Sequence, residues 1–457
     1  MVTTFFGAHS FGGDAAYVDR LTRALLRAGH EVHVAHCADA FEAVRGDHPL
    51  REFQPPEGAI VHRLESRFSL LSPLATQTTG QPYFKRKALK RILEDEAPDV
   101  IHFHNVSLIG GPGIFEFGER SIRLMTAHEH WLICPMHLLW KYNSKSCDKP
   151  ECARCMVAGG RPPQLWRLGD AIPRGLNRLD ALLFPSRHAL EEHRKRGISA
   201  PLVHLPYFLP DGWPYASNSN DNGSASIPSF PAERPYFAAA GRLVKMKGFQ
   251  QAIPLMRHLP EMDMRIAGTG PFEAELRALA EDLPNVKFEG LLGGPALARL
   301  FAGSRAVVVP SLFHETFGYV VLEAFASGVP VIVNRAGGAL EETGVESGGG
   351  LGYSTDAELL LAMRRLAHDD ALRAELAENG RRIRAGAWSE TAHLDRYFEL
   401  LGEIRHRKRG AGPHIAVSQP ARSSDSSPSS AFPRFEATTQ AEPHHGALTT
   451  TKSPLSF

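Results

Sequence analysis

The sequence predicts an α/β protein made of two doubly wound, Rossmann-like domains that face each other across a central cleft. Three observations lead to this prediction. The 457 residues exceed what one hydrophobic core usually holds. Short β-branched runs alternate with longer amphipathic runs in both halves, which is typical of βαβ units and a parallel sheet. Residues 213–235 separate the halves and read as a linker, because they are rich in Ser, Asn and Gly and show no periodicity.

The first half, residues 1–212, alternates less regularly than the second. Its β-branched runs predict strands and its amphipathic runs predict helices. We expect strands at 2–6, 31–36, 99–104, 122–127, 181–185 and 201–205, with helices at 14–28, 84–96 and 187–196.

The second half, residues 236–387, repeats the pattern more evenly. A final amphipathic segment, 388–408, begins with a capping-type serine and predicts a helix. Residues 410–457 are rich in Ser, Pro and Thr and predict a disordered tail. We expect strands at 236–240, 263–267, 286–289, 306–310 and 330–333, and helices that start near Phe249, Pro271, Pro295, Tyr319 and Leu340.

Composition excludes several classes of function. The formal net charge is +1, so no global field attracts nucleic acid. No apolar run of about 18 residues predicts a membrane span, and the N-terminus lacks the pattern of a signal peptide. We therefore expect a cytoplasmic enzyme with no nucleic-acid partner.

Basic residues follow the first strand of the second half. Gly241 ends that strand, and Arg242 and Lys247 come within the next six residues. A planar guanidinium with an ammonium suits a diphosphate, although two surface cations on a solvated turn would look the same. The next strand ends at Gly268 and Gly270, where a backbone without Cβ atoms can approach a ligand. Each turn alone is weak evidence.

Two glutamates bracket the start of a helix near Gly318. Glu323 lies among apolar residues, so it should be buried and should need a polar partner, either backbone amides or the vicinal diol of a ribose. Glu315 precedes the helix and is placed to meet hydroxyls of a sugar. The helix N-terminus between them favours a diphosphate.

These motifs together resemble the donor-binding domain of the retaining glycosyltransferase family 4, which has the two-domain GT-B fold. Gly-Arg-Leu-x-x-x-Lys-Gly is followed by Gly-Thr-Gly-Pro, Glu-x-Phe-Gly-x-x-x-x-Glu-Ala and a Gly-Gly turn. The resemblance implies that Arg242 and Lys247 contact the donor diphosphate, Glu315 the transferred sugar and Glu323 the ribose. It places the backbone of Phe317 and Gly318 near the phosphates, and it implies that helix 388–408 crosses back to the first domain.

The first half carries two further motifs of this resemblance. Gly12-Gly13 resembles the family's glycine loop, which lies near the donor phosphates and the acceptor, although Asp14 follows the pair directly. His128 ends a strand and resembles the family's active-site histidine, with His130 as the competing position. No Asp-x-Asp motif occurs, so we expect no catalytic metal and no cofactor.

A cysteine cluster lies outside the general family pattern. Within an expected insertion, 131–165, the spacing favours structural zinc, resembles some iron–sulfur spacings, and also permits no metal at all. The cysteines are Cys134, Cys147, Cys152 and Cys155.

The predicted function is transfer of a sugar from a nucleotide diphosphate sugar to a glycan or lipid-linked acceptor, in polysaccharide or glycoconjugate assembly. The alternatives are a GT-B phosphorylase or epimerase and a non-catalytic, metal-stapled binding protein. The basic helix at 84–93 suggests peripheral contact with the inner face of the cytoplasmic membrane, against the simpler interpretation of a solvated helix face.

Overall fold

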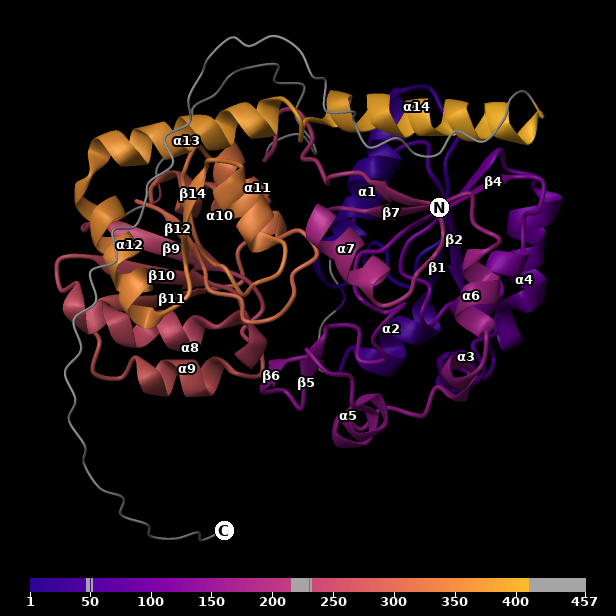
Figure 1. The fold of residues 1–457 in the computed structure, drawn as a ribbon, viewed down its shortest axis with the longest axis horizontal. Helices are drawn as coiled ribbons and strands as arrows, with labels where there is room; N and C mark the ends of the chain where they lie inside the picture. The colour runs from indigo at the N-terminus through magenta and orange to yellow at the C-terminus, as the bar shows by residue number, and fades with distance from the viewer. Residues whose placement is uncertain (47–49, 51, 215–229, 231, 411–457) are drawn as a thin grey trace, which may run out of the picture. The chain divides into compact units, whose positions relative to one another are not determined.

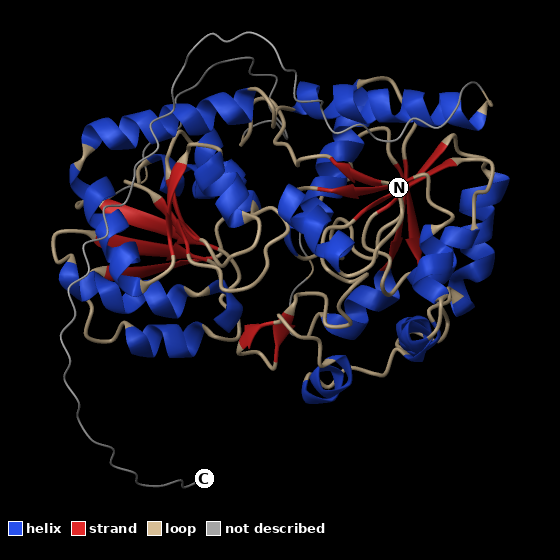
Figure 2. Ribbon diagram, in the orientation of Figure 1, coloured by secondary structure: helices blue, strands red, loops and turns tan. Residues whose placement is uncertain are grey.

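The computed structural model describes residues 1–46, 50, 52–214, 230 and 232–410. Residues 1–410 form one compact unit, which contains two parallel sheets with helices on both sides (Figure 1, Figure 2). Most of the linker expected at 213–235, and nearly all of the tail expected at 410–457, lie outside the described residues.

The N-terminal lobe is built on parallel strands. Val2 bridges Ala35 of β1 and Phe103 of β3, and so joins the pair β1-β2 to the four-stranded run β3-β4-β7-β8. The strand expected at 2–6 is reduced to isolated bridges, at Val2 and at Phe6, which pairs with His9 where the chain turns back at Gly7 with φ of +61°. The strands are β1 (His33–Cys37), β2 (Ile60–Leu64), β3 (Val100–Phe103), β4 (Ile122–Thr126), β7 (Ala181–Phe184) and β8 (Leu202–His204).

Helices cover this sheet, and a small hairpin, β5 (Trp140–Lys141) with β6 (Lys145–Ser146), lies beyond it. The helices are α1 (Gly12–Arg27), α2 (Ala38–Val44), α3 (Leu71–Thr79), α4 (Arg86–Lys90), α5 (Cys152–Ala158), α6 (Ala171–Leu176) and α7 (Arg187–Lys195). The basic helix expected at 84–96 is α4 with short turns at both ends. Its Leu89, Ile92 and Leu93 are buried in the core of the lobe, so that apolar face is not free to meet a membrane.

The C-terminal lobe has six parallel strands in the order β11-β10-β9-β12-β13-β14. This is the 3-2-1-4-5-6 order of a Rossmann sheet, whose ligand crevice lies where the order reverses, here between β9 and β12. The strands are β9 (Tyr236–Ala240), β10 (Asp263–Ala267), β11 (Val286–Gly290), β12 (Val307–Val309), β13 (Val331–Asn334) and β14 (Gly350–Tyr353).

Strand starts in this lobe agree with the expected ones to within one residue, but β14 and the two helices after it were not anticipated. The helix expected to open at Pro271 begins at Glu273. The helices are α8 (Phe249–Ala252), α9 (Glu273–Leu279), α10 (Gly294–Ala302), α11 (Tyr319–Ala326), α12 (Asp356–His368), α13 (Asp370–Ala385) and α14 (Glu390–Lys408).

Helix α14 lies along the N-terminal lobe (Figure 1). Ser389 caps its first turn by accepting a hydrogen bond from the Ala392 amide at 3.1 Å. Tyr397, Leu400 and Ile404 then pack against apolar side chains of β4 and β7. The C-terminal segment therefore ties the two lobes together and limits how far they can separate.

Candidate functional site

A cavity of about 530 Å³ lies between the lobes, at the carboxyl ends of both sheets. It opens where the C-terminal sheet reverses between β9 and β12, the position at which open α/β sheets bind ligands. The polar side chains that line it are Asp14, Asn105, His128, Glu129, His130, His137, Tyr207, Arg242, Lys247, Ser311, His314, Glu315, Thr316, Tyr319 and Glu323.

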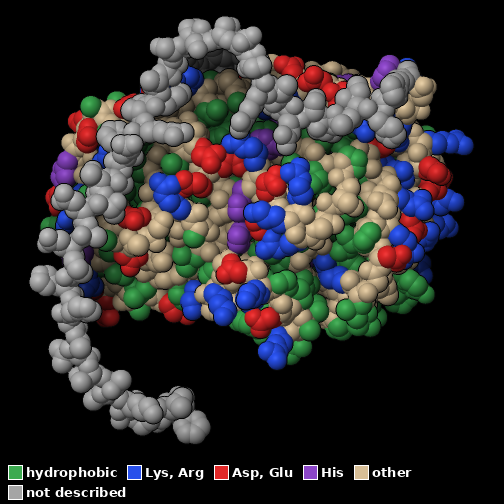
Figure 3. All heavy atoms as spheres, viewed as in Figure 1, with side chains coloured by type: hydrophobic (Ala, Val, Ile, Leu, Met, Phe, Trp, Pro, Cys, Tyr) green, Lys and Arg blue, Asp and Glu red, His purple; other side chains and the backbone are tan. Residues whose placement is uncertain are grey.

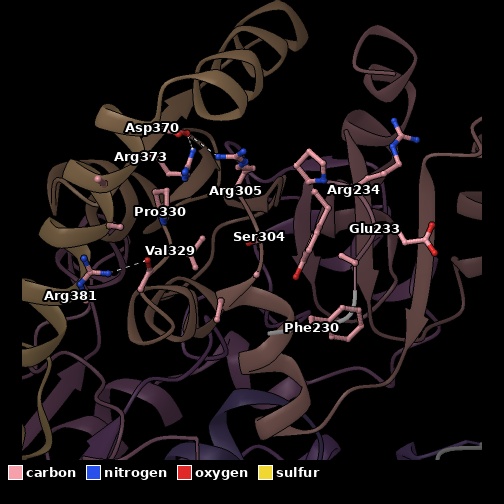
Figure 4. A pocket seen from close by; sticks show the side chains of 18 residues that line it. Phe230, Glu233, Arg234, Ser304, Arg305, Val329, Pro330, Asp370, Arg373 and Arg381 are labelled. Atoms are coloured by element: carbon pink, nitrogen blue, oxygen red, sulfur yellow. Dashed lines mark hydrogen bonds and ion pairs between the residues drawn. The ribbon is translucent and has the colours of Figure 1, made fainter. Parts of the chain in front are cut away.

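A larger cavity, of about 840 Å³, lies at the amino ends of the central strands β9, β12 and β13 (Figure 4). Its arginines are already engaged: Arg305 and Arg373 both donate to Asp370, at 2.9 and 2.5 Å, and Arg381 donates to the Gly328 carbonyl. Because those donors have partners and the strand ends there carry none of the predicted motifs, the interlobe cavity is the better candidate.

Lys247 and Glu315 meet in this cavity. The Lys247 ammonium donates to Glu315 Oε1 at 2.6 Å. Gly248 makes the approach possible, because its φ is +76° and a Cβ there would lie 1.8 Å from the Pro310 carbonyl oxygen. Arg242 lines the same cavity, and its guanidinium has no side-chain partner among the described residues. The two residues predicted to bind the diphosphate, Arg242 and Lys247, therefore line one cavity. The Arg242 guanidinium remains available for a ligand.

The carboxylate of Glu315 is oriented by its own lobe. Oε1 accepts hydrogen bonds from Lys247 and from the Ser311 hydroxyl, the latter at 2.8 Å. The backbone of Glu315 pairs with that of Gly338, where a Cβ would come within 2.8 Å of it. Within the described residues, Oε2 accepts no hydrogen bond, so one carboxylate oxygen is held and the other is free for a ligand.

Glu323 has a partner that the sequence did not reveal. Arg20 of α1 lies across the cleft, with its Nη2 3.5 Å from Glu323 Oε1 and its guanidinium 4.6 Å from the ring centre of Tyr319. Burial nevertheless raises the pKa of Glu323, because one long ion pair does not offset the loss of hydration. No local pattern could have identified Arg20, since it lies 303 residues away on another lobe.

The predicted glycines fall into two groups. Gly12, Gly13, Gly241 and Gly318 line the cavity, and Gly318, with φ of +88°, caps α11. Gly268 and Gly270 do not line it: a Cβ at either position would meet the backbone of Gly241 or Leu243 at about 2 Å. Their absent side chains let two turns pack together, and direct contact of these two with a donor stays a prediction.

Phe317 is 2% exposed and packs in the core against Tyr207 and Trp388. Its side chain therefore supports the turn into α11 and does not line the cavity. Only its backbone can serve a ligand, as the resemblance implies.

Asp14 is the least compensated acid on the N-terminal side. Its carboxylate accepts from the Ala15 amide at 2.9 Å and from the Asn105 amide at 3.4 Å, and no Lys or Arg among the described residues pairs with it. Burial, with a smaller contribution from Glu129, raises the pKa of Asp14 to about 6. Glu129 is paired with His137 at 2.8 Å. Asp14, Asn105, Glu129 and His137 all line the interlobe cavity, and the sequence motifs did not predict that they lie together.

His128 lines the cavity, but both of its ring nitrogens have protein partners. Nδ1 is hydrogen-bonded to the Tyr207 hydroxyl, and Nε2 lies 3.0 Å from His104 Nδ1. Burial lowers the pKa of His128 to about 3, so the ring is neutral near pH 7. His130 Nε2 bonds the His314 carbonyl at 3.0 Å, and its Nδ1 is buried without a partner in the described chain. The choice between the two histidines remains a prediction.

The four clustered cysteines are all free thiols, three of them buried. Cys134 and Cys147 pack together with Leu139, and the other cysteines influence the pKa of the Cys147 thiol, which burial raises. Among the described residues no group of three or more His, Cys, Asp or Glu side chains is arranged to hold a metal ion. Structural zinc therefore remains a prediction that rests on the spacing.

Family models match both lobes. Residues 11–207 match the model described as Glycosyltransferase Family 4, and residues 224–383 match the model described as Glycosyl transferases group 1. Together they span the two lobes whose strand ends form the interlobe cavity.

The chain is also similar to known glycosyltransferases, two of which illustrate the range of identity and coverage. The sulfoquinovosyl transferase SQD2 of Arabidopsis thaliana is 26% identical over 63% of this chain and 55% of that protein. The GDP-mannose-dependent alpha-(1-6)-phosphatidylinositol monomannoside mannosyltransferase of Mycolicibacterium smegmatis is 30% identical over 52% of this chain and 66% of that protein. The chain thus spans a little over half of the first relative and just under two thirds of the second.

The structure of Anabaena HepE in complex with UDP superposes with a TM-score of 0.59 at 17% identity, over 88% of this chain and 99% of that one. This likeness shows the GT-B fold. In the part of the chain that the structure describes, no helix has the length and apolarity needed to cross a membrane.

Proposed function

The chain belongs to the family 4 glycosyltransferases of group 1 and has the GT-B fold, and on this premise we propose that it transfers a sugar from a nucleotide diphosphate sugar to an acceptor hydroxyl. One observation carries the proposal. Two cations and two carboxylates from separate motifs, Arg242, Lys247, Glu315 and Glu323, line a single cavity at the switch point of the C-terminal sheet.

In the proposed reaction the bond between the anomeric carbon and the phosphate oxygen breaks, and a bond from that carbon to the acceptor oxygen forms. The acceptor proton leaves with the nucleoside diphosphate. Charge develops on the departing diphosphate, and the uncommitted Arg242, the Lys247 ammonium and the amides that follow Gly318 would stabilise it. This chemistry needs no metal or other cofactor beyond the donor. Retention of configuration is proposed from the family.

The carboxylates have separate roles in this proposal. Glu315 Oε2, free of protein partners among the described residues, would accept from hydroxyls of the transferred sugar while Oε1 stays on Lys247 and Ser311. Glu323 would accept from the ribose diol, for which its position on α11, partly buried and lining the cavity, is suited. A phosphorylase or epimerase is less well supported, because no pyridoxal lysine or dedicated phosphate pocket is identifiable.

Peripheral contact with the inner face of the cytoplasmic membrane is the second part of the proposal. The name of the mycobacterial relative includes phosphatidylinositol monomannoside. This chain exposes a cluster of large apolar side chains on the N-terminal lobe beside basic α4. Figure 3 shows hydrophobic side chains gathered over α3 and α5, next to basic ones. The cluster comprises Phe68, Leu70, Leu71, Leu74, Tyr83, Phe84, Leu165 and Leu168, each between 38% and 88% exposed.

Vesicle flotation tests the membrane contact. The protein should float with phosphatidylglycerol vesicles and much less with phosphatidylcholine vesicles, because Lys87 and Arg91 beside the cluster have no ion-pair partner in the described chain. Leu71→Asp should abolish flotation. Leu361→Asp, on α12 of the other lobe and 59% exposed, is the matched control and should float normally. Equal flotation of both variants would contradict the proposal that this cluster binds the membrane.

Activity tests the transferase assignment. Purified protein is incubated with UDP-, GDP- and ADP-sugars, after a thermal-shift screen of the three nucleotides identifies the base. Glu315→Gln should lower turnover ~10- to 100-fold, the range of a lost charge-assisted hydrogen bond. Glu375→Gln, on an exposed face of α13, serves as the control. No turnover of any donor by the wild type, or unchanged turnover of Glu315→Gln, would overturn the assignment.

A further inference from the structure

The loop that carries Glu315 is held from the opposite lobe. His314, the preceding residue, has its Nε2 2.9 Å from the Ser146 hydroxyl and its Nδ1 3.1 Å from His188 Nε2. Its carbonyl accepts a hydrogen bond from His130 Nε2 at 3.0 Å. Ser146 belongs to the Cys-rich segment, His188 to α7 and His130 to the loop after β4, so three separate parts of the N-terminal lobe converge on one residue.

Thr316, on the other side of Glu315, is held in the same way. Its hydroxyl donates to the His128 carbonyl at 2.9 Å, and its own carbonyl accepts from the Ser186 hydroxyl at 2.7 Å. Ser186 also caps α7 through the Ala189 amide. Both neighbours of Glu315 are therefore fixed to the N-terminal lobe, while the Glu315 side chain is fixed to the C-terminal lobe.

The contacts to His314 are consistent with neutral rings. Burial lowers the pKa of His188 to about 4, and it lowers the pKa of His314 as well. A neutral imidazole has one donor and one acceptor nitrogen, so Ser146, His314 and His188 can form one continuous chain of hydrogen bonds. The His314 and His188 rings are also stacked, with centroids 5.3 Å apart. His130 must donate from Nε2, because the carbonyl it meets can only accept.

We propose that His314 is a positioning residue, through which Ser146 of the Cys-rich segment and His188 of α7 hold Glu315 in place against the transferred sugar. This inference rests on the proposed function. The Cys-rich segment thereby gains a function, because its Ser146 reaches across the cleft to His314, the residue before the predicted sugar-binding Glu315. The nucleotide is not expected to depend on this contact, because Arg242 and Glu323 lie outside the held loop.

A pair of serine variants tests the proposal. Ser146→Ala removes the partner of His314 Nε2 and should lower kcat about fivefold, the effect of one neutral hydrogen bond. Affinity for the nucleoside diphosphate, measured with UDP, GDP or ADP as the screen selects, should change less than twofold. Ser144→Ala is the matched control: it lies two residues away, is exposed, and bonds only within its own turn, to Lys141. Ser146→Thr, which keeps the hydroxyl, should restore kcat.

A double mutant and hydrogen exchange complete the test. In a His314→Phe background, Ser146→Ala should have no additional effect on kcat, because the two residues act through one contact. Backbone amides of residues 311–318 should exchange faster in Ser146→Ala than in Ser144→Ala. Equal exchange, or additive kinetic effects, would overturn the proposal. The exchange measurement needs no substrate, so it decides the positioning role even if the wild type proves to transfer no sugar.

Discussion

Replacement of Asp14 with asparagine should stabilise the protein at pH 7.5 and stabilise it much less at pH 4.5. Burial raises the pKa of Asp14 from 3.8 to about 6. Because the folded state binds the proton more tightly, stability falls as pH rises from about 3.8 to 6 and carries the full penalty above that window. A shift of about two units corresponds to ~3 kcal/mol at most.

The stabilisation expected from Asp14→Asn is smaller than this limit. Asp14 is only half-buried and faces an open cavity, so solvent screening reduces the penalty to ~1–2 kcal/mol. At pH 4.5 about a third of it remains, since the unfolded carboxylate is by then only partly protonated. For a chain of this size the gain at pH 7.5 corresponds to an increase of ~1–2 °C in the thermal midpoint.

The assay compares thermal midpoints of Asp14→Asn and wild type at both pH values. The matched control is Asp19→Asn, on the same helix, where the carboxylate is paired with Arg23 at 3.0 Å and no stabilisation is expected. The reasoning is refuted if Asp14→Asn gains equally at both pH values, or if it lowers the midpoint at pH 7.5. A buried carboxylate that lowers stability is retained when it contributes to function. We therefore expect Asp14→Asn to weaken acceptor binding.

Two further predictions concern the same cleft, and a third concerns the cysteine cluster. Glu323→Gln should weaken nucleoside diphosphate binding ~10-fold by isothermal titration, through loss of charge-assisted bonds to the ribose, and unchanged affinity would contradict that role. Gly13→Ala should lower activity, because its Cβ would lie 2.9 Å from the Tyr319 ring on the facing lobe. The control Gly402→Ala has open space around it and should keep full activity. Equal activities of the two variants would argue against closure of this contact during turnover. Elemental analysis should find about one zinc per chain, and absence of both zinc and iron would show that the cysteine cluster binds no such metal.

Much of the C-terminal lobe could be predicted from local pattern. Alternation of β-branched and amphipathic runs located five of its strands, because parallel strands buried on both faces need continuous apolar runs. The same argument failed at residues 2–6, where the structure has isolated bridges at Val2 and Phe6 instead of a strand. It also failed at β2, whose partly exposed residues carry little apolar signal.

The candidate site was predicted in part. Arg242, Lys247, Glu315 and Glu323 follow strand ends or open a helix, so their position in the sheet order brings them to one cavity. Gly268 and Gly270 follow a strand end as well, yet they face the backbone of the neighbouring turn. Sequence pattern identifies a glycine, but it does not distinguish one that admits a ligand from one that admits another loop.

By itself, the sequence determined the fold class, the family and the residue types at the ends of the C-terminal strands, because these depend on periodicity and on short motifs whose members are close along the chain. Only the tertiary structure decided which partners those residues have. Arg20 meets Glu323, Ser146 meets His314, and Tyr207 meets His128 across separations of 303, 168 and 79 residues. The first two contacts join the two lobes and the third joins two segments of the N-terminal lobe. All three depend on tertiary packing, which no local pattern encodes.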